Sequence, residues 1–211
     1  MSAELAKAAN AKKPSHSPQA ETARILVEFL EVAVTSILYL KGLYPSGAYE
    51  RRRYLNLLVH RAIHPELRNY IYSSVNELFA FIEKGLVERI AVIFFGCDGV
   101  PVEKFVFKLH VSQSNGSEVE EDQLESSLGS LLVKLSVSDM LTKVLPSDCK
   151  WEIAAYFNAL PDTDATKETQ FWKPTQTKQW CQPSLITPIK SMSSESVALQ
   201  LYVEHQTETE I

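Results

Sequence analysis

Histidine and cysteine side chains are the residues of this sequence that could bind a metal ion or act in catalysis. His60 and His64 stand four residues apart in "HRAIH", a spacing that invites a zinc site. The segment lacks the glutamate of the HExxH motif, and Pro65 marks a new helix start, so the two rings need not share one face. A small metal-dependent hydrolase that uses His60, His64 and Cys181 stays open as an alternative, and His64 is interpreted as a helix-entry residue.

Other catalytic patterns are missing from the sequence. The seven glycines form neither a GxGxxG motif nor a phosphate-binding loop, and no GxSxG segment occurs. The sequence contains three cysteines, Cys97, Cys149 and Cys181. An odd number of widely spaced cysteines is typical neither of a disulfide framework nor of a zinc knuckle. The acidic run "EVEED" is interpreted as exposed loop charge. We therefore predict a protein that is not an enzyme and that needs no cofactor or metal.

The charge balance argues against a nucleic-acid-binding protein. The 211 residues include 21 basic and 26 acidic side chains, a formal net charge of -5. Binding to a phosphate backbone requires a basic surface. The only basic cluster of note is "RRR" at residues 51–53, for which a solvated loop and a phosphate contact are both considered.

Aromatic side chains and prolines distinguish the region from residue 161 to residue 196. This segment contains four prolines, including Pro174, together with Trp172 and Trp180, and it has no helical period. Loops of this length are uncommon in compact domains and are usually functional or disordered. Apolar rings between prolines predict a strap that packs onto something. This pattern favours a binding module that captures an extended peptide.

The first element that would position such a strap is the apolar run at residues 25–40, "ILVEFLEVAVTSILYL". The run is too short and too charged for a membrane span and lacks the flanks of a secretion signal. Arg24, Glu28, Glu31 and Thr35 follow at spacings of four, three and four, which places them along one helical seam. We expect a helix that is buried on most of its circumference and has one wet stripe.

The remaining elements predict an α+β domain. Periodic apolar residues indicate a helix from Pro65 to a stop at Gly85. Apolar runs at residues 87–95 and 102–111 indicate two strands, joined by a hairpin at Asp98-Gly99. A third helix is expected up to Pro146, and two further strands over residues 150–160 and 197–205. The inner side of that helix is predicted to carry Leu124, Leu128, Leu131, Leu132, Leu135 and Leu141.

Several segments resemble, in the same order, a known family. They are "EFLEVAV", "ILY", "YP", "HPEL", "PVEKFVF", "LLVKLSVSD" and "LITPIKSM…LQLYVE". The chain resembles the HORMA-domain family, in its branch of accessory subunits of DNA polymerase zeta. The resemblance implies a single domain over residues 21–205, with three helices packed on a mainly antiparallel sheet. Residues 158–205 would form a C-terminal safety belt, and residues 1–20 and 206–211 would be disordered tails.

The resemblance also implies partners. In this family the belt closes over a proline-containing peptide, which here would come from the catalytic subunit of DNA polymerase zeta. The accessory subunit would bridge to a Y-family scaffold polymerase in damage tolerance, and an AAA+ ATPase could reopen the belt. Such a protein is expected in the nucleus, with the cytoplasm as a further location, and without nucleic-acid or membrane binding of its own. A spindle-checkpoint or meiotic HORMA adaptor with a different peptide is the alternative.

The peptide-binding residues follow from the matching segments. Tyr70 in "HPELRNY" matches a tyrosine that lines the peptide groove, although a half-buried helix tyrosine would give the same pattern. Trp172 resembles a belt tryptophan that clamps the ligand. Pro174 stands where the family has the leucine of a second clamp contact, and Trp180 has no counterpart.

Two further positions concern other contacts of the family. The later part of the belt implies a second-partner surface with Leu185, Gln200 and Tyr202. Gly129 stands where the family carries an arginine that is central to HORMA–HORMA dimers. A glycine cannot make that contact, so a homodimer of the family's kind is not expected.

Overall fold

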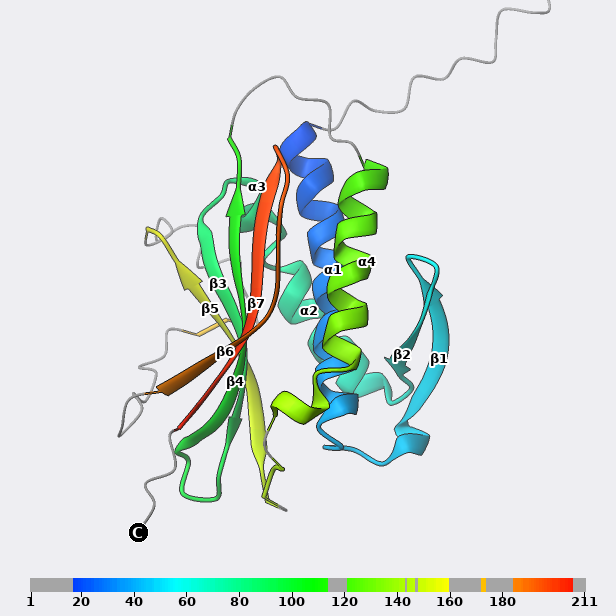
Figure 1. Cartoon of the computed structure of the whole chain (residues 1–211), viewed down its shortest axis with the longest axis vertical. Coiled ribbons are helices and arrows are strands. Elements are labelled where there is room, and N and C mark those ends of the chain that lie inside the picture. Colours follow the sequence, from blue (N-terminus) through cyan, green and yellow to red (C-terminus); the bar gives the residue numbers. More distant parts are fainter. Residues whose placement is uncertain are drawn as a thin grey trace, which may run out of the picture.

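The computed structural model describes residues 17–113, 121–142, 144–146, 148–159, 172–173 and 184–206. They form three layers, with a five-stranded sheet on one side, helices in the middle, and a two-stranded hairpin across the helices (Figure 1). The α+β prediction of helices on an antiparallel sheet is confirmed. The described domain extends slightly beyond the predicted bounds, because α1 begins at Pro18 and the last strand ends at Gln206.

Helix α1 (Pro18–Leu40) runs through the centre of the domain. The Ser17 hydroxyl accepts a hydrogen bond from the Ala20 backbone N–H at 3.0 Å, and proline fits the first helical position, so the helix starts inside the predicted tail. The expected wet stripe is shorter than predicted. Thr35 is only 5% exposed and donates its hydroxyl hydrogen to the Glu31 carbonyl. Among the described helices, none is long and apolar enough to span a bilayer.

A hairpin follows where the sequence indicated only a turn and a short extended piece. Strands β1 (Tyr49–Tyr54) and β2 (Leu57–Ala62) pair in antiparallel register after a short 3₁₀ turn, η1 (Ser46–Ala48). Leu55 and Asn56 form its two-residue loop with φ angles of 47° and 60°. Positive φ at both positions is what a tight hairpin needs, but Leu-Asn is not one of the usual sequence signals for it.

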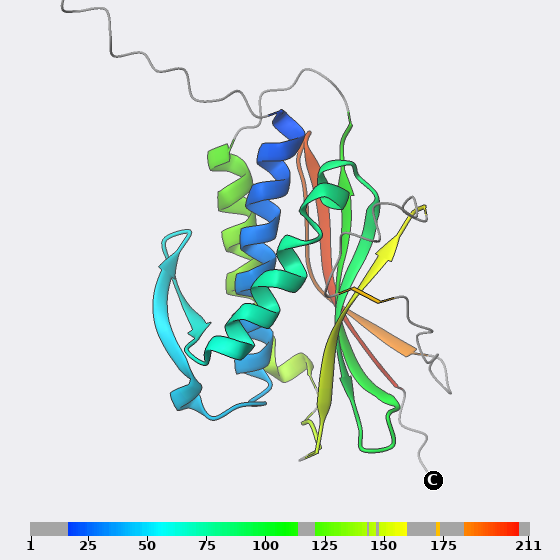
Figure 2. The ribbon, with the colours of Figure 1, turned by 180° about the vertical axis from the view of Figure 1, so that it is seen from behind.

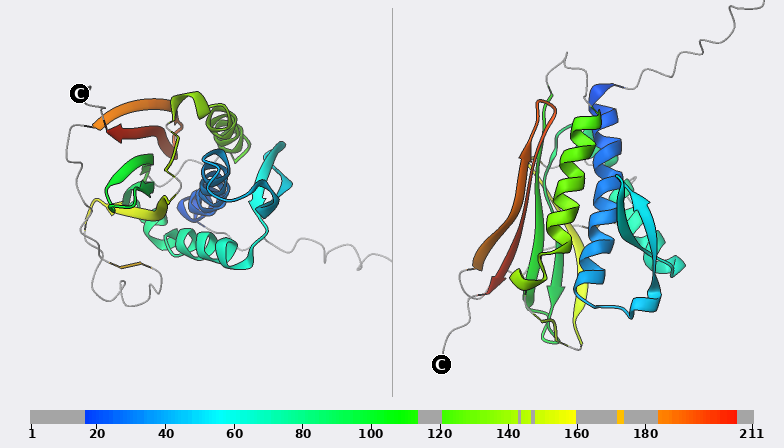
Figure 3. Two further views of the ribbon diagram at one scale, coloured as in Figure 1. Left: turned by 90° about the horizontal axis from the view of Figure 1, so that it is seen from below. Right: turned by 45° about the vertical axis from the view of Figure 1, so that its right-hand side comes forward.

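The helix predicted from Pro65 to Gly85 is divided in two. Helix α2 (Pro65–Asn76) and the short helix α3 (Phe79–Glu83) cover the part of the sheet nearest β5, as Figures 2 and 3 show. Gly85 ends the pair with a φ of 66°, as the stop signal predicted. The prediction merged them because the apolar spacing continues through the break.

Helix α4 (Glu121–Ser136) covers the other part of the sheet, next to β6 and β7 (Figure 3). It ends earlier than predicted and is followed by a 3₁₀ turn, η2 (Asp139–Leu141). Leu141 is therefore 44% exposed instead of lying on the inner side of the helix. The other leucines expected on that side are buried.

The sheet has the order β5-β3-β4-β7-β6, with every neighbouring pair antiparallel. Its strands are β3 (Val87–Phe95), β4 (Pro101–Val111), β5 (Lys150–Phe157), β6 (Ser184–Ser193) and β7 (Val197–Gln206). Strand β6 was not predicted, because Pro188 interrupts its pattern. It lies at an edge of the sheet with a register shift just after Pro188, and these are the positions at which sheets tolerate proline.

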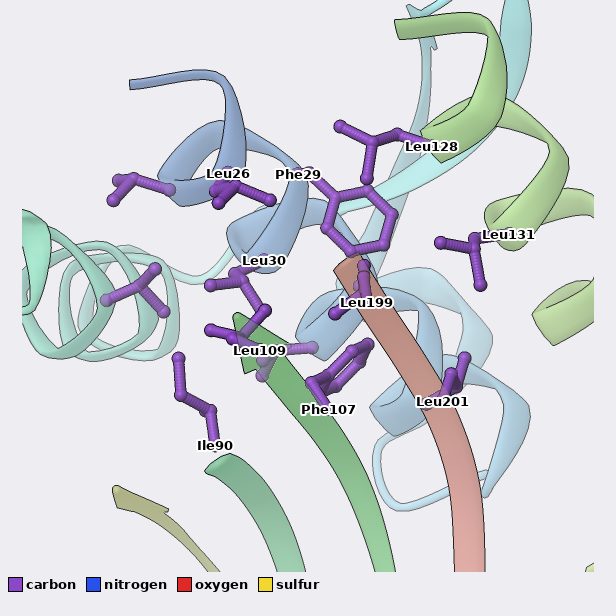
Figure 4. Close-up of a cluster of buried hydrophobic side chains, with 14 of the residues drawn as sticks. Leu26, Phe29, Leu30, Ile90, Phe107, Leu109, Leu128, Leu131, Leu199 and Leu201 are labelled. Carbon is purple, nitrogen blue, oxygen red and sulfur yellow. The ribbon is translucent and has the colours of Figure 1, made fainter. Parts of the chain in front are cut away.

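The core fills the space between the sheet and the helices. Phe29 of α1 meets Phe107 of β4 edge to face, with ring centroids 6.1 Å apart. The same buried cluster includes Leu128 and Leu131 of α4 and Leu199 of β7 (Figure 4). Ile71 and Val75 of α2 belong to the same buried cluster, so burial of apolar surface also holds α2 against the rest of the core.

Candidate functional site

Strand β5 forms one edge of the sheet, and no described strand pairs with its outer side. An unpaired edge presents backbone N–H and C=O groups that can bind an extended chain. The backbone N–H of Ile153 points to this side, because it donates a hydrogen bond to the Tyr70 hydroxyl of α2. Since backbone groups alternate along a strand, those of Trp151 and Ala155 face the same free edge.

Aromatic side chains gather beside this edge. The Trp151 indole Nε1–H donates to the Tyr44 hydroxyl at 3.0 Å. The rings of Tyr70 and Trp151 meet edge to face with centroids 5.5 Å apart. Burial raises the pKa of the Tyr70 hydroxyl, and the hydrogen bond from Ile153 partly opposes that rise. Tyr70 thus lies between α2 and β5 and is 37% exposed, and its role in lining a peptide groove stays a prediction.

Trp172 attaches the C-terminal strap to the same helix. Its indole Nε1–H donates to the backbone carbonyl of Ser74 at 3.0 Å, and its ring packs against the core. Ser74 lies one turn after Tyr70 on α2 and is 3% exposed. The structure therefore brings Tyr70 and Trp172 to one helix face beside the free edge of β5. Pro174, Trp180 and Cys181 lie outside the described residues.

The predicted second-partner residues do not all share one face. Gln200 and Tyr202 of β7 point to the sheet face away from the helices. Leu185 pairs with His205, an odd number of positions from Tyr202, so Leu185 points to the opposite face. Ile186 pairs with Glu204 instead, shares the face of Tyr202 and is 55% exposed. Because the sequence predicted no strand there, the alternation that separates Leu185 from Ile186 could not be used.

His60 and His64 have separate surroundings in the structure. The His60 ring stacks on Tyr39 with centroids 3.4 Å apart, and burial together with Arg51 lowers the pKa of His60. His64 occupies the N-cap position of α2, the helix entry that was predicted. Within the described part of the chain, no three His, Cys, Asp or Glu side chains are grouped so that they could hold a metal ion.

The hairpin accounts for two other sequence features. The "RRR" run lies on β1, where Arg52 and Arg61 of β2 approach the Glu50 carboxylate at 3.6 and 3.8 Å. Gly129 lies beneath the hairpin loop, and a Cβ at that position would be 3.8 Å from the Cβ of Leu55. The hairpin loop thus lies over the helix face that carries Gly129, the position for which the resemblance implied a dimer contact.

Comparison with known proteins identifies the fold family. The HORMA domain family model matches residues 23–183. The chain belongs to the HORMA-domain family. It is 56% identical to the DNA polymerase zeta processivity subunit of Arabidopsis thaliana, over 90% of this chain and 88% of that protein. It is 31% identical to the human mitotic spindle assembly checkpoint protein MAD2B, over 87% and 90% of the two chains. With these relatives, this HORMA chain is a non-catalytic protein, as predicted.

Solved structures share the fold of this HORMA domain. A chain of the mitotic checkpoint complex has a TM-score of 0.72, with 17% identity, over 89% of this chain and 99% of that one. Caenorhabditis elegans HTP-2 bound to the HIM-3 closure motif has a TM-score of 0.74, with 10% identity, over 91% and 93%. At these identities the likeness concerns the fold alone.

Proposed function

We propose that this HORMA protein is the accessory subunit of DNA polymerase zeta and that it holds a proline-containing peptide of the catalytic subunit between its belt and the edge of β5. The observation that carries this proposal is the hydrogen bond from Trp172 of the strap to Ser74 of α2, beside Tyr70 and the free edge. The 56% identity to a polymerase zeta processivity subunit supports the choice of partner.

The peptide would bind as an added strand. Its backbone would pair with the outward-facing groups of Trp151 and Ala155, and its side chains would contact the Tyr70 and Trp172 rings. The Tyr70 hydroxyl would have to leave the Ile153 N–H for pairing to continue along the strand. A belt that closes over the peptide makes dissociation slow, because the peptide can leave only after the strap detaches from α2.

A second polymerase would bind elsewhere on the same chain. We propose that Ile186, Gln200 and Tyr202, on the sheet face away from the helices, contact the Y-family scaffold polymerase. This face is separate from the peptide edge, so both partners could bind together and the protein would bridge them. We further propose that an AAA+ ATPase reopens the belt and that the protein is located in the nucleus. Imaging of the tagged protein in its own cells tests the location.

The peptide assignment is tested by measuring binding of a proline-containing peptide from the catalytic subunit. We expect Tyr70→Ala and Trp172→Ala to weaken binding by tenfold or more, because each change removes a buried aromatic contact at the interface. Tyr72→Ala is the matched control, since Tyr72 lies on the same helix and is 53% exposed. Equal binding by wild type and Trp172→Ala would show that the clamp assignment is wrong.

A checkpoint adaptor is the second candidate function. It is favoured by the 31% identity to human MAD2B, whose name includes the spindle assembly checkpoint. Affinity purification of the tagged chain from its own cells distinguishes the two. Recovery of polymerase subunits supports the first proposal, whereas recovery of checkpoint or meiotic proteins without them supports the second.

A further inference from the structure

The sheet face away from the helices has an unusual surface. Ala91 of β3, Val106 of β4 and Ala154 of β5 lie next to one another on it and are 1%, 3% and 6% exposed. No described helix covers this face (Figure 1). Small side chains on an uncovered sheet are shielded only if longer neighbours lie flat over them. The neighbours packed against this group include Tyr156 of β5 and Tyr202 of β7.

Arg89 of β3 joins these two tyrosines. Its guanidinium carbon lies 4.9 Å from the centre of the Tyr156 ring, in a cation–π arrangement. Burial raises the pKa of the Tyr202 hydroxyl, which comes from two strands away, and the Arg89 guanidinium lies close enough to oppose part of that rise. Arg89 therefore links the edge strand β5 to β7 across the small residues between them.

The remaining contacts of Arg89 are weak. The nearest acidic oxygen is Oε1 of Glu88, at 3.5 Å from Nε, and the Arg89 side chain is 38% exposed. That Nε–H is buried and has no hydrogen-bond partner. An arginine with a nearby carboxylate usually forms close paired hydrogen bonds. Here the guanidinium instead lies over the Tyr156 ring.

We infer that Arg89 is a positioning residue for the second-partner surface, because it fixes the Tyr202 side chain, which packs against the small residues of the sheet, beside Ile186 and Gln200. The inference rests on the proposed role of Tyr202 in binding the second polymerase. Arginine suits this task because its planar group can stack on one ring while it donates to the other, which a lysine cannot do. Tyr156 supports this arrangement, because the guanidinium packs on its ring.

The test is a double-mutant cycle, read as affinity for the partner-binding domain of the Y-family polymerase. Arg89→Met removes the guanidinium and keeps an unbranched apolar chain; Tyr202→Phe removes only the hydroxyl. We expect each change to weaken binding about tenfold, the value for loss of one hydrogen bond to a charged group. The double variant should bind about as the single variants do, because both remove the same interaction. Arg89→Lys should restore little.

Two controls keep the inference falsifiable. Lys150 of β5 is exposed and lies on the same sheet face as Ala154 but at the far edge from β7, so Lys150→Met removes a cation from that face and should leave binding unchanged. Tyr156→Leu removes the supporting ring without changing Arg89 and should weaken binding in the same direction. Affinity for the catalytic-subunit peptide should stay at the wild-type value in every variant, which shows that the fold is intact.

The outcomes separate the two proposals. Losses for Arg89→Met and Tyr202→Phe that multiply in the double variant would overturn the inference, because Arg89 would then act independently of Tyr202. Wild-type binding by Arg89→Met while Tyr202→Ala binds poorly would overturn the inference but leave the second-partner surface in place. Wild-type binding by Tyr202→Ala would overturn the second-partner surface and the role of Arg89 with it.

Discussion

A salt bridge between Lys41 and Glu103 lies inside the domain. The Lys41 Nζ is 2.6 Å from the Glu103 Oε2, and the two side chains are 2% and 0% exposed. Lys41 caps the C-terminus of α1 and Glu103 belongs to β4, opposite His205 of β7. The pair therefore connects the central helix to the strand on which the C-terminal hairpin is built.

Removing one partner of this pair should be costly. We predict that Glu103→Leu lowers the free energy of unfolding by about 3–5 kcal/mol, because it leaves the Lys41 ammonium buried without its counter-ion. The double variant Lys41→Met/Glu103→Leu should recover most of that loss. Urea denaturation measures both. The exposed pair Arg24–Glu28 is the control, and Glu28→Gln should cost less than about 1 kcal/mol. A similar loss for Glu28→Gln and Glu103→Leu would contradict this view of the buried pair.

At the scale of elements, the end of α3 depends on Gly85. Its φ of 66° is unfavourable for residues with a Cβ, and an added Cβ would lie 2.9 Å from the Gln113 Nε2 and 3.3 Å from the Val111 carbonyl oxygen. That glycine sets the direction in which the chain enters β3. It thereby sets the position of β3, the strand with which β5 pairs.

Gly85→Ala should therefore destabilise the domain by about 1–2 kcal/mol, the usual cost of left-handed backbone for a residue with a side chain. Gly47→Ala is the control, because Gly47 has no positive φ and its Cβ would meet nothing within 4 Å. Thermal unfolding of both variants measures the difference. Equal midpoints for the two variants would show that the turn adjusts without strain.

At the scale of the whole molecule, most of the architecture could be predicted from periodic apolar residues and stop signals. The signals fail where local sequence and structure disagree. Leu55-Asn56 turns a hairpin without the usual Gly, and Pro188 lies in an edge strand that local propensity excludes. Leu185, which the family resemblance groups with Gln200 and Tyr202, lies on the other face of the sheet, because one position along a strand changes the face.

The candidate site also combines features that the sequence predicts with features that only the fold provides. Tyr70 and Trp172 were predicted through a family resemblance alone. No spacing in the sequence indicates that Trp172, which comes 98 positions after Ser74, lies beside it. Their convergence on α2 is a property of the fold. The contribution of Trp151 and of the free β5 edge depends on strand order, which single-sequence patterns do not contain.

Amide hydrogen exchange tests the central claim most directly, namely that the peptide of the catalytic subunit adds a strand to β5. It should be measured on the full chain with and without that peptide. We predict that the Trp151 and Ala155 amides, which face the free edge, become strongly protected when the peptide binds. Amides that face the opposite free edge, such as that of Ile186 in β6, should keep their exchange rates. Protection along β6 and none along β5 would contradict the proposed site.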